Sequence, residues 1–166
     1  NHRGAQGNGV QAGVFKIPAN SRAEPDFKRL GVELKLTAFR RLKNGKMAAK
    51  NRMSLNMIDY MDEYGKTFET TSFYQKARTI LVMIYLWDDK KDIADMEIYD
   101  AFYMNIDDGN LAVIKNDIVI IQELIKSGNM DKYRESINKI VAACPKSEHF
   151  RRQPFSPHPE EARRAV

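Results

Sequence analysis

Several features that mark particular classes of protein are scarce or missing in this sequence. Its 166 residues contain one cysteine, Cys144, so an internal disulfide is excluded and a reducing compartment is favoured. No apolar run approaches the roughly 18 residues that a membrane-spanning helix requires, and the N-terminus has no apolar signal core. We therefore expect a soluble, cytoplasmic protein that has no membrane partner.

A nucleotide-binding loop of the common kind is also missing. Residues 1–13 are rich in glycine, but no Gly-Lys-Ser or Gly-Lys-Thr comes after them. The chain does have an excess of 27 Lys and Arg over 22 Asp and Glu, a formal net charge of +5, and 43% apolar residues. This composition predicts one core and one domain, and the charge is compatible with a polyanionic partner.

The segment PDFKRLGVELKLT, residues 25–37, carries the clearest chemical pattern. From Val32 to Leu36 apolar and charged residues alternate, which is the period of a strand. Such a strand turns Glu33 and Lys35 to the face opposite its apolar residues. A carboxylate and an ammonium group are therefore predicted to lie side by side.

A second carboxylate, Asp26, lies seven residues before Glu33. Gly31, together with Pro25, permits a bend that returns Asp26 to the side of Glu33. Two carboxylates suit Mg²⁺, which takes few protein ligands and keeps water and phosphate in its other positions. Lys35 would complete a hydrolytic site. A solvated, charged strand face is the commoner meaning of this spacing, so the pattern alone leaves both interpretations open.

The same segment resembles the active-site segment of the MutH-like family in the PD-(D/E)XK nuclease group. That family comprises mismatch-repair endonucleases and type II restriction endonucleases that cut at GATC. The resemblance implies an α/β, restriction-endonuclease-like mixed sheet flanked by helices. It also implies that Asp26 and Glu33 bind the metal with the carbonyl of Leu34, and that Lys35 is catalytic. It extends in patches to residue 156, so we predict a domain over 1–156 and a disordered tail over 157–166.

One position near the N-terminus departs from the family pattern. Gly4, Gly7 and Gln11 match a family segment in which the third position is usually a glutamate that helps to organise the metal site. An amide can still hydrogen-bond a metal-bound water, but it adds no negative charge. The resemblance therefore leaves the activity of this chain open at Gln11.

A cluster of cations comes directly after the predicted strand, in the segment FRRLKNGKMAAKNR. Asn44-Gly45 is a strong signal for a tight hairpin turn, whose arms the cations would line. We predict phosphate contacts, which position DNA without reading its sequence, although a charged, solvated hairpin is the alternative. The cations are Arg40, Arg41, Lys43, Lys46, Lys50 and Arg52.

Hydrophobic spacing predicts the remaining elements. A helix is expected over Ser54–Tyr64 with Ser54 as its N-cap, and a central strand buried on both faces over Ile80–Trp87. Another strand is expected over Met96–Ile106. A helix is expected over Leu111–Lys126, capped by Asp107 or Asp108 and ended by Gly128.

The resemblance assigns roles to two later segments. The interval from Glu69 to Lys76 matches one that precedes an active-site lysine in the family, so Lys76 is expected to contact the phosphate or the attacking water. The segment INKIVAACPK reads as helical turns or a short strand, and the resemblance favours a strand that leads into a base-contacting loop. The DNA contacts implied there are Pro145, Lys146, Arg151 and Arg152.

Together with these residues, the resemblance implies a Mg²⁺-dependent type II restriction endonuclease that cleaves double-stranded DNA at GATC-like sites. Two alternatives are a mismatch-repair endonuclease, which nicks one strand and waits for a protein activator, and a catalytically impaired DNA-binding module of the same fold. A basic globular domain without a role on nucleic acid is a further alternative.

Overall fold

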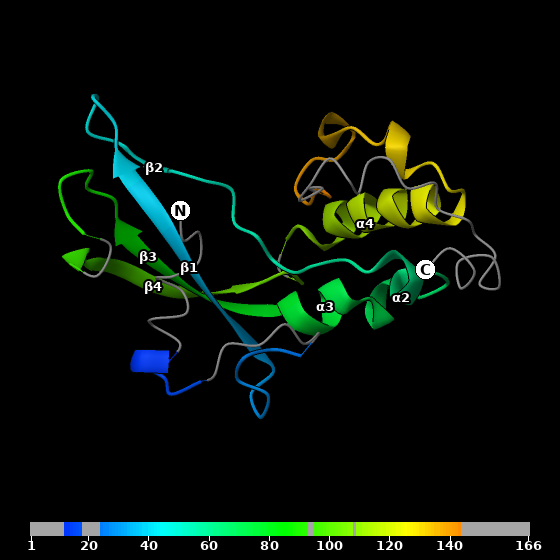
Figure 1. Ribbon diagram of the computed structural model, residues 1–166, viewed down its shortest axis with the longest axis horizontal. Helices are drawn as coiled ribbons and strands as arrows, with labels where there is room; N and C mark the ends of the chain where they lie inside the picture. The colour runs from blue at the N-terminus through cyan, green and yellow to red at the C-terminus, as the bar shows by residue number, and fades with distance from the viewer. Residues whose placement is uncertain (1–11, 18–23, 93–94, 108, 144–166) are drawn as a thin grey trace. The chain divides into compact units, whose positions relative to one another are not determined.

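The computed structural model describes residues 12–17, 24–92, 95–107 and 109–143. The chain divides into two compact units, one formed by Asn1–Asn56 with Gln75–Asn105 and the other by Met57–Tyr74 with Ile106–Val166. The first unit contains the strands, and the second contains the longest helix (Figure 1). Among the described residues, no helix combines the length and hydrophobicity needed to span a membrane.

The strands form one mixed sheet in the order β2-β1-β3-β4 (Figure 1). β1 runs parallel to β3 and antiparallel to β2, and β3 runs antiparallel to β4. The mixed sheet expected from the sequence is therefore confirmed, although the first strand extends beyond Leu36 because its second half also pairs with β2. The bounds are β1 Val32–Arg41, β2 Met47–Ala49, β3 Thr79–Leu86 and β4 Ile98–Asn105.

The strand β3 is central, as predicted, but the prediction that both of its faces are buried is wrong. Ile80, Val82 and Ile84 are buried, whereas the residues between them are partly exposed. A continuous apolar run therefore gives an alternating burial pattern here, because one face of this strand is only partly covered. β4 is the edge strand, and its Tyr99 and Tyr103 side chains are exposed.

The Asn44-Gly45 turn joins β1 to β2, as predicted. Gly45 has φ +80°, a conformation that glycine adopts without strain, and the N–H of Leu42 donates to the carbonyl of Lys46 at 2.8 Å. The side chain of Asn44 accepts the N–H of Lys46 at 3.1 Å. The turn therefore directs the cation-rich arms of β1 and β2 back along each other.

In the second unit, α4 (Leu111–Lys126) has the predicted bounds. It ends in a Schellman motif: Gly128 has φ +67°, and the N–H of Asn129 donates to the carbonyl of Leu124 at 2.9 Å. The predicted cap at Asp107 is wrong, because the N-cap is Asn110 and Asp107 accepts the hydroxyl of Tyr74 instead. Asp108 lies outside the described residues.

The helix predicted over Ser54–Tyr64 is much shorter than expected. Only α2 (Tyr60–Glu63) forms, because the carboxylate of Asp59 caps the N–H groups of the first turn and begins the helix after itself. Ser54 is therefore not the N-cap. A short helix α3 (Ser72–Ala77) then leads directly into β3.

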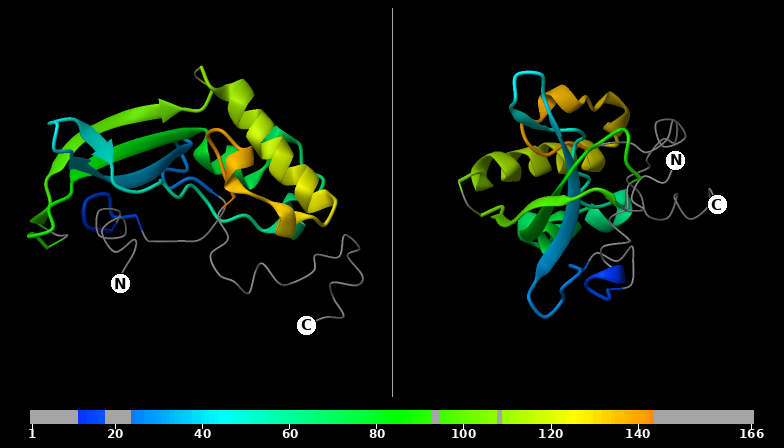
Figure 2. Two further views of the ribbon diagram at one scale, coloured as in Figure 1. Left: turned by 90° about the horizontal axis from the view of Figure 1, so that it is seen from above. Right: turned by 90° about the vertical axis from the view of Figure 1, so that its left-hand side faces the viewer.

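The segment after α4 is neither of the predicted alternatives. Single 3-10 turns occur at Met130–Lys132 and Glu135–Ile137, and residues 138–143 have no regular secondary structure. Figure 2 shows this segment lying back along α4. Its backbone N–H groups at residues 139–141 donate to the side chain of Asp117 in α4, and they are therefore not available to a helix or a strand.

Candidate active site

A tight turn immediately before β1 sets up the candidate site. The N–H of Phe27 donates to the carbonyl of Val32 at 2.8 Å, and the N–H of Leu30 donates to the carbonyl of Phe27 at 3.0 Å. Gly31 closes this turn with φ +65°, in the left-handed region that strains other residues. The chain thereby reverses direction just after Asp26.

The reversal places Asp26 beside Glu33, as the sequence predicted. The backbone N–H of Asp26 donates to Glu33 Oε2 at 3.2 Å. In return, the carboxylate of Asp26 accepts the backbone N–H of Leu34 at 3.0 Å. Glu33 thus bonds the backbone of Asp26, and Asp26 bonds the backbone of Leu34, the residue after Glu33, so the main chain holds the two acidic residues side by side.

Two lysines converge on the same carboxylate from different elements. Lys35 Nζ lies 2.9 Å from Glu33 Oε1 and comes from the same face of β1. Lys76 Nζ lies 3.6 Å from the same oxygen and comes from α3, directly before β3. Because Ile80 of β3 pairs with Glu33 of β1, the sheet register brings Lys76 to the site.

The carboxylate of Glu33 is almost completely shielded from water. It is 2% exposed, and burial raises its pKa above the ordinary value of 4.5. Lys35 and Lys76 act in the opposite direction, while the negative charge of Asp26 adds to the rise. Burial is the largest of these influences, so the pKa of Glu33 stays above its ordinary value despite the two ammonium groups.

The donor set suits a hard divalent cation. Asp26 and Glu33, which backbone hydrogen bonds hold side by side, both supply carboxylate oxygens, the ligand type that Mg²⁺ prefers. No group of three or more His, Cys, Asp and Glu side chains gathers in the described ranges. A cation here would therefore depend on this acidic pair, and the ligand role expected for the carbonyl of Leu34 stays a prediction.

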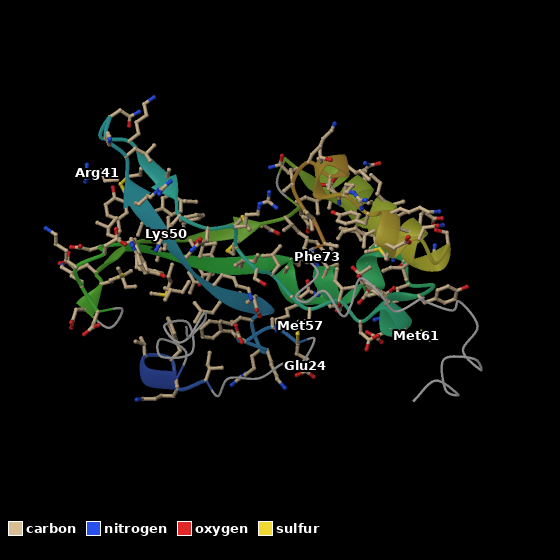
Figure 3. All side chains as sticks on the ribbon, turned by 45° about the horizontal axis from the view of Figure 1, so that its top comes forward. Glu24, Arg41, Lys50, Met57, Met61 and Phe73 are labelled. Carbon is tan, nitrogen blue, oxygen red and sulfur yellow. The ribbon has the colours of Figure 1, made fainter. Side chains whose placement is uncertain are left out.

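The residues predicted to contact DNA fall into two groups, one of which lies within the described residues. Arg40, Arg41, Lys43 and Lys46 are exposed on β1 and the turn after it. Figure 3 shows Arg41 at the end of β1 far from Glu24, with Lys50 on the same hairpin. The remaining predicted positions lie outside the described residues: Gln11, Pro145, Lys146, Arg151 and Arg152. The boundaries 1–156 and 157–166 also stay predictions.

Lys50 differs from the other hairpin cations. Its Nζ lies 2.7 Å from the ring centroid of Trp87, the only tryptophan in the sequence. Backbone bonds place the two residues on either side of β1, since Lys50 N–H donates to Ala38 and Trp87 N–H donates to Phe39, both at 2.8 Å. This cation–π contact joins Lys50, just after β2, to Trp87, just after β3, so the ammonium group that was predicted to contact phosphate has a partner within the protein.

Sequence reasoning missed one contact beside the site. The ring of Phe15 packs edge to face against Phe27, with centroids 5.3 Å apart and an interplanar angle of 88°. This contact ties residues 12–17 to the turn just after Asp26. No periodicity marks Phe15 in the sequence; its only signal is an isolated aromatic residue in a polar, glycine-rich stretch.

Asp26 lies just before β1 and Glu33 and Lys35 lie at its start, within a mixed sheet of the α/β, restriction-endonuclease-like kind. The family model described as DNA mismatch repair enzyme MutH matches residues 15–117, and the chain belongs to that family. The matched range includes all four residues of the cluster, so the resemblance seen in the sequence and the α/β fold that it implied are confirmed.

Two relatives sharpen this assignment. The chain is 34% identical over 150 residues to the type II restriction enzyme Sau3AI of Staphylococcus aureus, covering 86% of this chain and 30% of that enzyme. It is 28% identical over 133 residues to the DNA mismatch repair protein MutH of Shewanella woodyi, covering 80% of this chain and 56% of that protein. The chain therefore spans less than two thirds of either relative.

Proposed function

We propose that this chain is a Mg²⁺-dependent endonuclease of the restriction type, which hydrolyses phosphodiester bonds in double-stranded DNA at GATC-like sites. The observation that carries the proposal is the cluster of Asp26, Glu33, Lys35 and Lys76 around one buried carboxylate. Membership of the MutH family supports action on DNA. The higher identity to Sau3AI than to the repair protein supports the restriction type.

Each residue of the cluster has a role that fits its position. Asp26 and Glu33, with the carbonyl of Leu34, would hold Mg²⁺, which when bound lowers the pKa of a water molecule and stabilises charge on the phosphate. Lys35 is close enough to Glu33 to orient or deprotonate the attacking water beside it. Lys76 approaches from α3 and would contact the phosphate or the same water.

The DNA would be held by two kinds of contact. The exposed cations Arg40, Arg41, Lys43 and Lys46 would neutralise phosphates and position the duplex without reading it. Base contacts would come from Pro145 and Lys146, because lysine can reach O6 and N7 of guanine in the major groove. Arg151 and Arg152 would add further contacts.

Two specific observations support alternative functions. The matched family is described as a mismatch repair enzyme, which supports a nicking endonuclease that depends on a protein activator. Gln11 stands where the family pattern has a glutamate, which supports a module that binds DNA without cutting it. Both alternatives retain the fold and the acidic pair, so they differ from the main proposal in the product formed.

Cleavage of a supercoiled plasmid that carries several GATC sites tests the proposal. Wild-type protein, Lys35→Ala and Gln11→Glu are compared with Mg²⁺, and Lys126→Ala serves as a control that removes the same charge from an exposed pair with Glu123. We expect discrete fragments from the wild type and Lys126→Ala, and none from Lys35→Ala.

The products also separate the alternatives. Nicked circles alone would support the repair type, and cleavage by Gln11→Glu alone would support the impaired module. If no version cuts or binds DNA, the proposed function is wrong.

A further inference from the structure

A further buried carboxylate, Glu63, takes no part in the cluster around Glu33. It is the last residue of α2 and is 5% exposed. The backbone N–H of Ser72, the first residue of α3, donates to Glu63 Oε1 at 2.9 Å. Lys66 Nζ lies 3.6 Å from the same oxygen but is closer to Asp62, at 2.6 Å. The closer of these two contacts of Glu63 is therefore with the start of α3.

The residue before α3 also accepts a backbone N–H of this helix. Thr71 Oγ1 accepts the N–H of Tyr74 at 3.2 Å, which is the bond expected of an N-cap residue. The same hydroxyl donates to the carbonyl of Phe68 at 2.6 Å, and Thr71 is 1% exposed. The first N–H groups of a helix have no acceptor within it. At the start of α3, Glu63 and Thr71 supply two of the missing acceptors.

The helix α3 is too short to form without contacts outside itself. Its six residues allow few bonds within the helix, and an isolated helix of this length is not stable in water. The side chains of Phe73 and Ala77 are buried, so packing contributes to its stability. Packing supplies no acceptors for the N–H groups of the first turn, and the two polar contacts are therefore needed in addition.

The side chain of α3 that reaches the candidate site is Lys76, in the last turn of the helix. Its Nζ lies 3.6 Å from Glu33 Oε1, and its side chain is 11% exposed. Lys35 lies 2.9 Å from the same oxygen, and it is carried by the ten-residue strand β1, which pairs with β2 and β3. Because Lys76 depends on a helix of six residues, its position is the more sensitive of the two to the contacts at the start of α3.

We propose that Glu63 is a positioning residue for Lys76, and that it acts together with Thr71 through the start of α3. This inference rests on the proposed function, in which Lys76 contacts the phosphate or the attacking water. Loss of the acceptor at Glu63 loosens the first turn of α3, so Lys76 spends less time beside Glu33. Glu63 is buried and carries no positive charge. Its loss should therefore slow the chemical step and leave DNA binding unchanged.

The test compares single-turnover cleavage of a GATC duplex in Mg²⁺ with binding of the same duplex in Ca²⁺, for the 166-residue chain. Glu63→Met removes the acceptor but suits the apolar side chains around it, whereas Glu63→Gln retains an acceptor. These apolar neighbours are Ile58, Phe73, Ile118, Ile121 and Ile125. We expect Glu63→Met to slow cleavage by about tenfold with affinity changed by less than about twofold, and Glu63→Gln to retain most of the rate. Asp62→Ala is the matched control and should cut at the wild-type rate, because it removes an exposed carboxylate that contacts the same Lys66.

Two further measurements show whether the effect passes through α3 and Lys76. Hydrogen exchange of the backbone amides over residues 72–77 should be faster in Glu63→Met than in the wild type. Lys76→Ala should slow cleavage by about a hundredfold, and adding Glu63→Met to it should slow cleavage no further, because two changes that act through one group are not additive. If Lys76→Ala leaves too little cleavage to measure, Glu63→Gln is compared with Glu63→Met, and equal rates for these two count against the inference.

The remaining outcomes overturn the inference in distinguishable ways. Wild-type cleavage or wild-type hydrogen exchange in a folded Glu63→Met protein overturns it and leaves the proposed function intact. A parallel loss of DNA affinity, or an equal further loss of rate in the Lys76→Ala protein, also overturns it, because Glu63 would then only maintain structure. If Glu63→Met does not fold, Thr71→Val is measured in the same way, and an additive effect with Lys76→Ala counts against the inference. Lys76→Ala with the wild-type rate overturns the role of Lys76 together with this inference, and a wild-type protein that does not cut the duplex overturns the proposed function as well.

Discussion

Two carboxylates of this protein are equally hidden from water and yet behave in opposite ways. Glu33 is 2% exposed and Asp117 is 1% exposed. The pKa of Glu33 is raised because burial outweighs its lysine partners, whereas the pKa of Asp117 is lowered because backbone N–H groups outweigh burial. The degree of burial alone therefore does not tell which buried acid is available for chemistry.

The difference lies in the partners. Asp117 receives three N–H groups whose positions the backbone dictates, at distances of 2.7 to 3.0 Å for their shorter bonds. Glu33 receives one backbone N–H, that of Asp26 at 3.2 Å, and two ammonium groups on long side chains, one of them as far as 3.6 Å away. Asp117 is thus held by backbone donors in fixed positions, whereas Glu33 is held mainly by long side chains, and this difference agrees with the metal-binding role proposed for Glu33.

The largest expected effect is that of Glu33→Gln on cleavage, because Glu33 is the buried carboxylate proposed to hold the metal. The cleavage rate should fall by at least about a thousandfold, because metal-ion catalysis supplies several kcal/mol and each 1.4 kcal/mol is about tenfold in rate. Single-turnover cleavage of a GATC duplex measures the loss, and thermal unfolding should show a folded protein. Glu123→Gln is the matched control. Cleavage by Glu33→Gln near the wild-type rate would contradict the assigned role.

The second effect is that of Asp117→Asn on stability. Asp117→Asn should lower the free energy of unfolding by about 2–4 kcal/mol, because it leaves buried N–H groups facing an amide that has its own donors. Urea unfolding at pH 7 measures this change. A loss no larger than that of Glu123→Gln would show that the N–H bonds to Asp117 contribute little.

The contributions of Glu33 and Asp117 to stability should change with pH in opposite directions. Ionised Asp117 stabilises the fold above its unfolded pKa of about 3.9, and this contribution is lost as pH falls through the lower folded pKa. For Glu33 the folded pKa is the higher one, so its contribution is present below the unfolded pKa and is lost as pH rises through the folded pKa. As pH rises, Asp117→Asn should therefore lose stability relative to wild type below about pH 5, and Glu33→Gln should gain stability relative to wild type above about pH 4. Urea unfolding across this range measures both trends, and trends of the same sign would contradict the assignment.

The candidate site was more predictable from the sequence than the contacts between Asp117 and residues 139–141 were. The alternation around Glu33 is local, and Gly31 is the residue a reversal after Asp26 needs, so spacing sufficed to bring these residues together. Lys76 needed the family resemblance, because its approach depends on the register between β1 and β3. Register is a long-range property that periodicity does not encode.

Two predictions of secondary structure were wrong for the same reason. In each case a carboxylate side chain accepts the backbone N–H groups that a predicted helix or strand would use. The side chain of Asp59 accepts N–H groups of the first turn of α2, so the helix begins after Asp59 and not after Ser54. Asp117 took the N–H groups of residues 139–141, which the sequence suggested for a helix or a strand. In the sequence, Asp117 is a charged residue among the apolar residues of α4, and the backbone N–H groups that donate to it come more than twenty residues later. Local pattern analysis has no access to such competition.

A smaller effect is expected at the turn that brings the two acids together. Gly31→Ala should cost about 1 kcal/mol, because φ +65° strains a residue with a Cβ although open space surrounds it. Gly65→Ala is a matched control, with φ +80° and equally open surroundings at the end of α2. Both variants should lose similar stability in urea unfolding, but only Gly31→Ala should also slow cleavage. Equal rates would show that Asp26 keeps its place without this turn.

The smallest effect concerns the face of β1 that carries Glu33. No register shift interrupts β1 between Val32 and Phe39, and the pairing continues into β2, so alternate residues share a face. Arg41 therefore lies on the face of Glu33, and Arg40 lies on the opposite face. If DNA approaches the acidic pair along this face, Arg41→Ala should reduce the salt dependence of binding by about one phosphate contact, and Arg40→Ala should reduce it less. Binding of a scrambled duplex over a range of salt concentrations measures both slopes. Equal slopes would mean that the duplex lies across the end of the hairpin rather than along the face of β1 that carries Glu33.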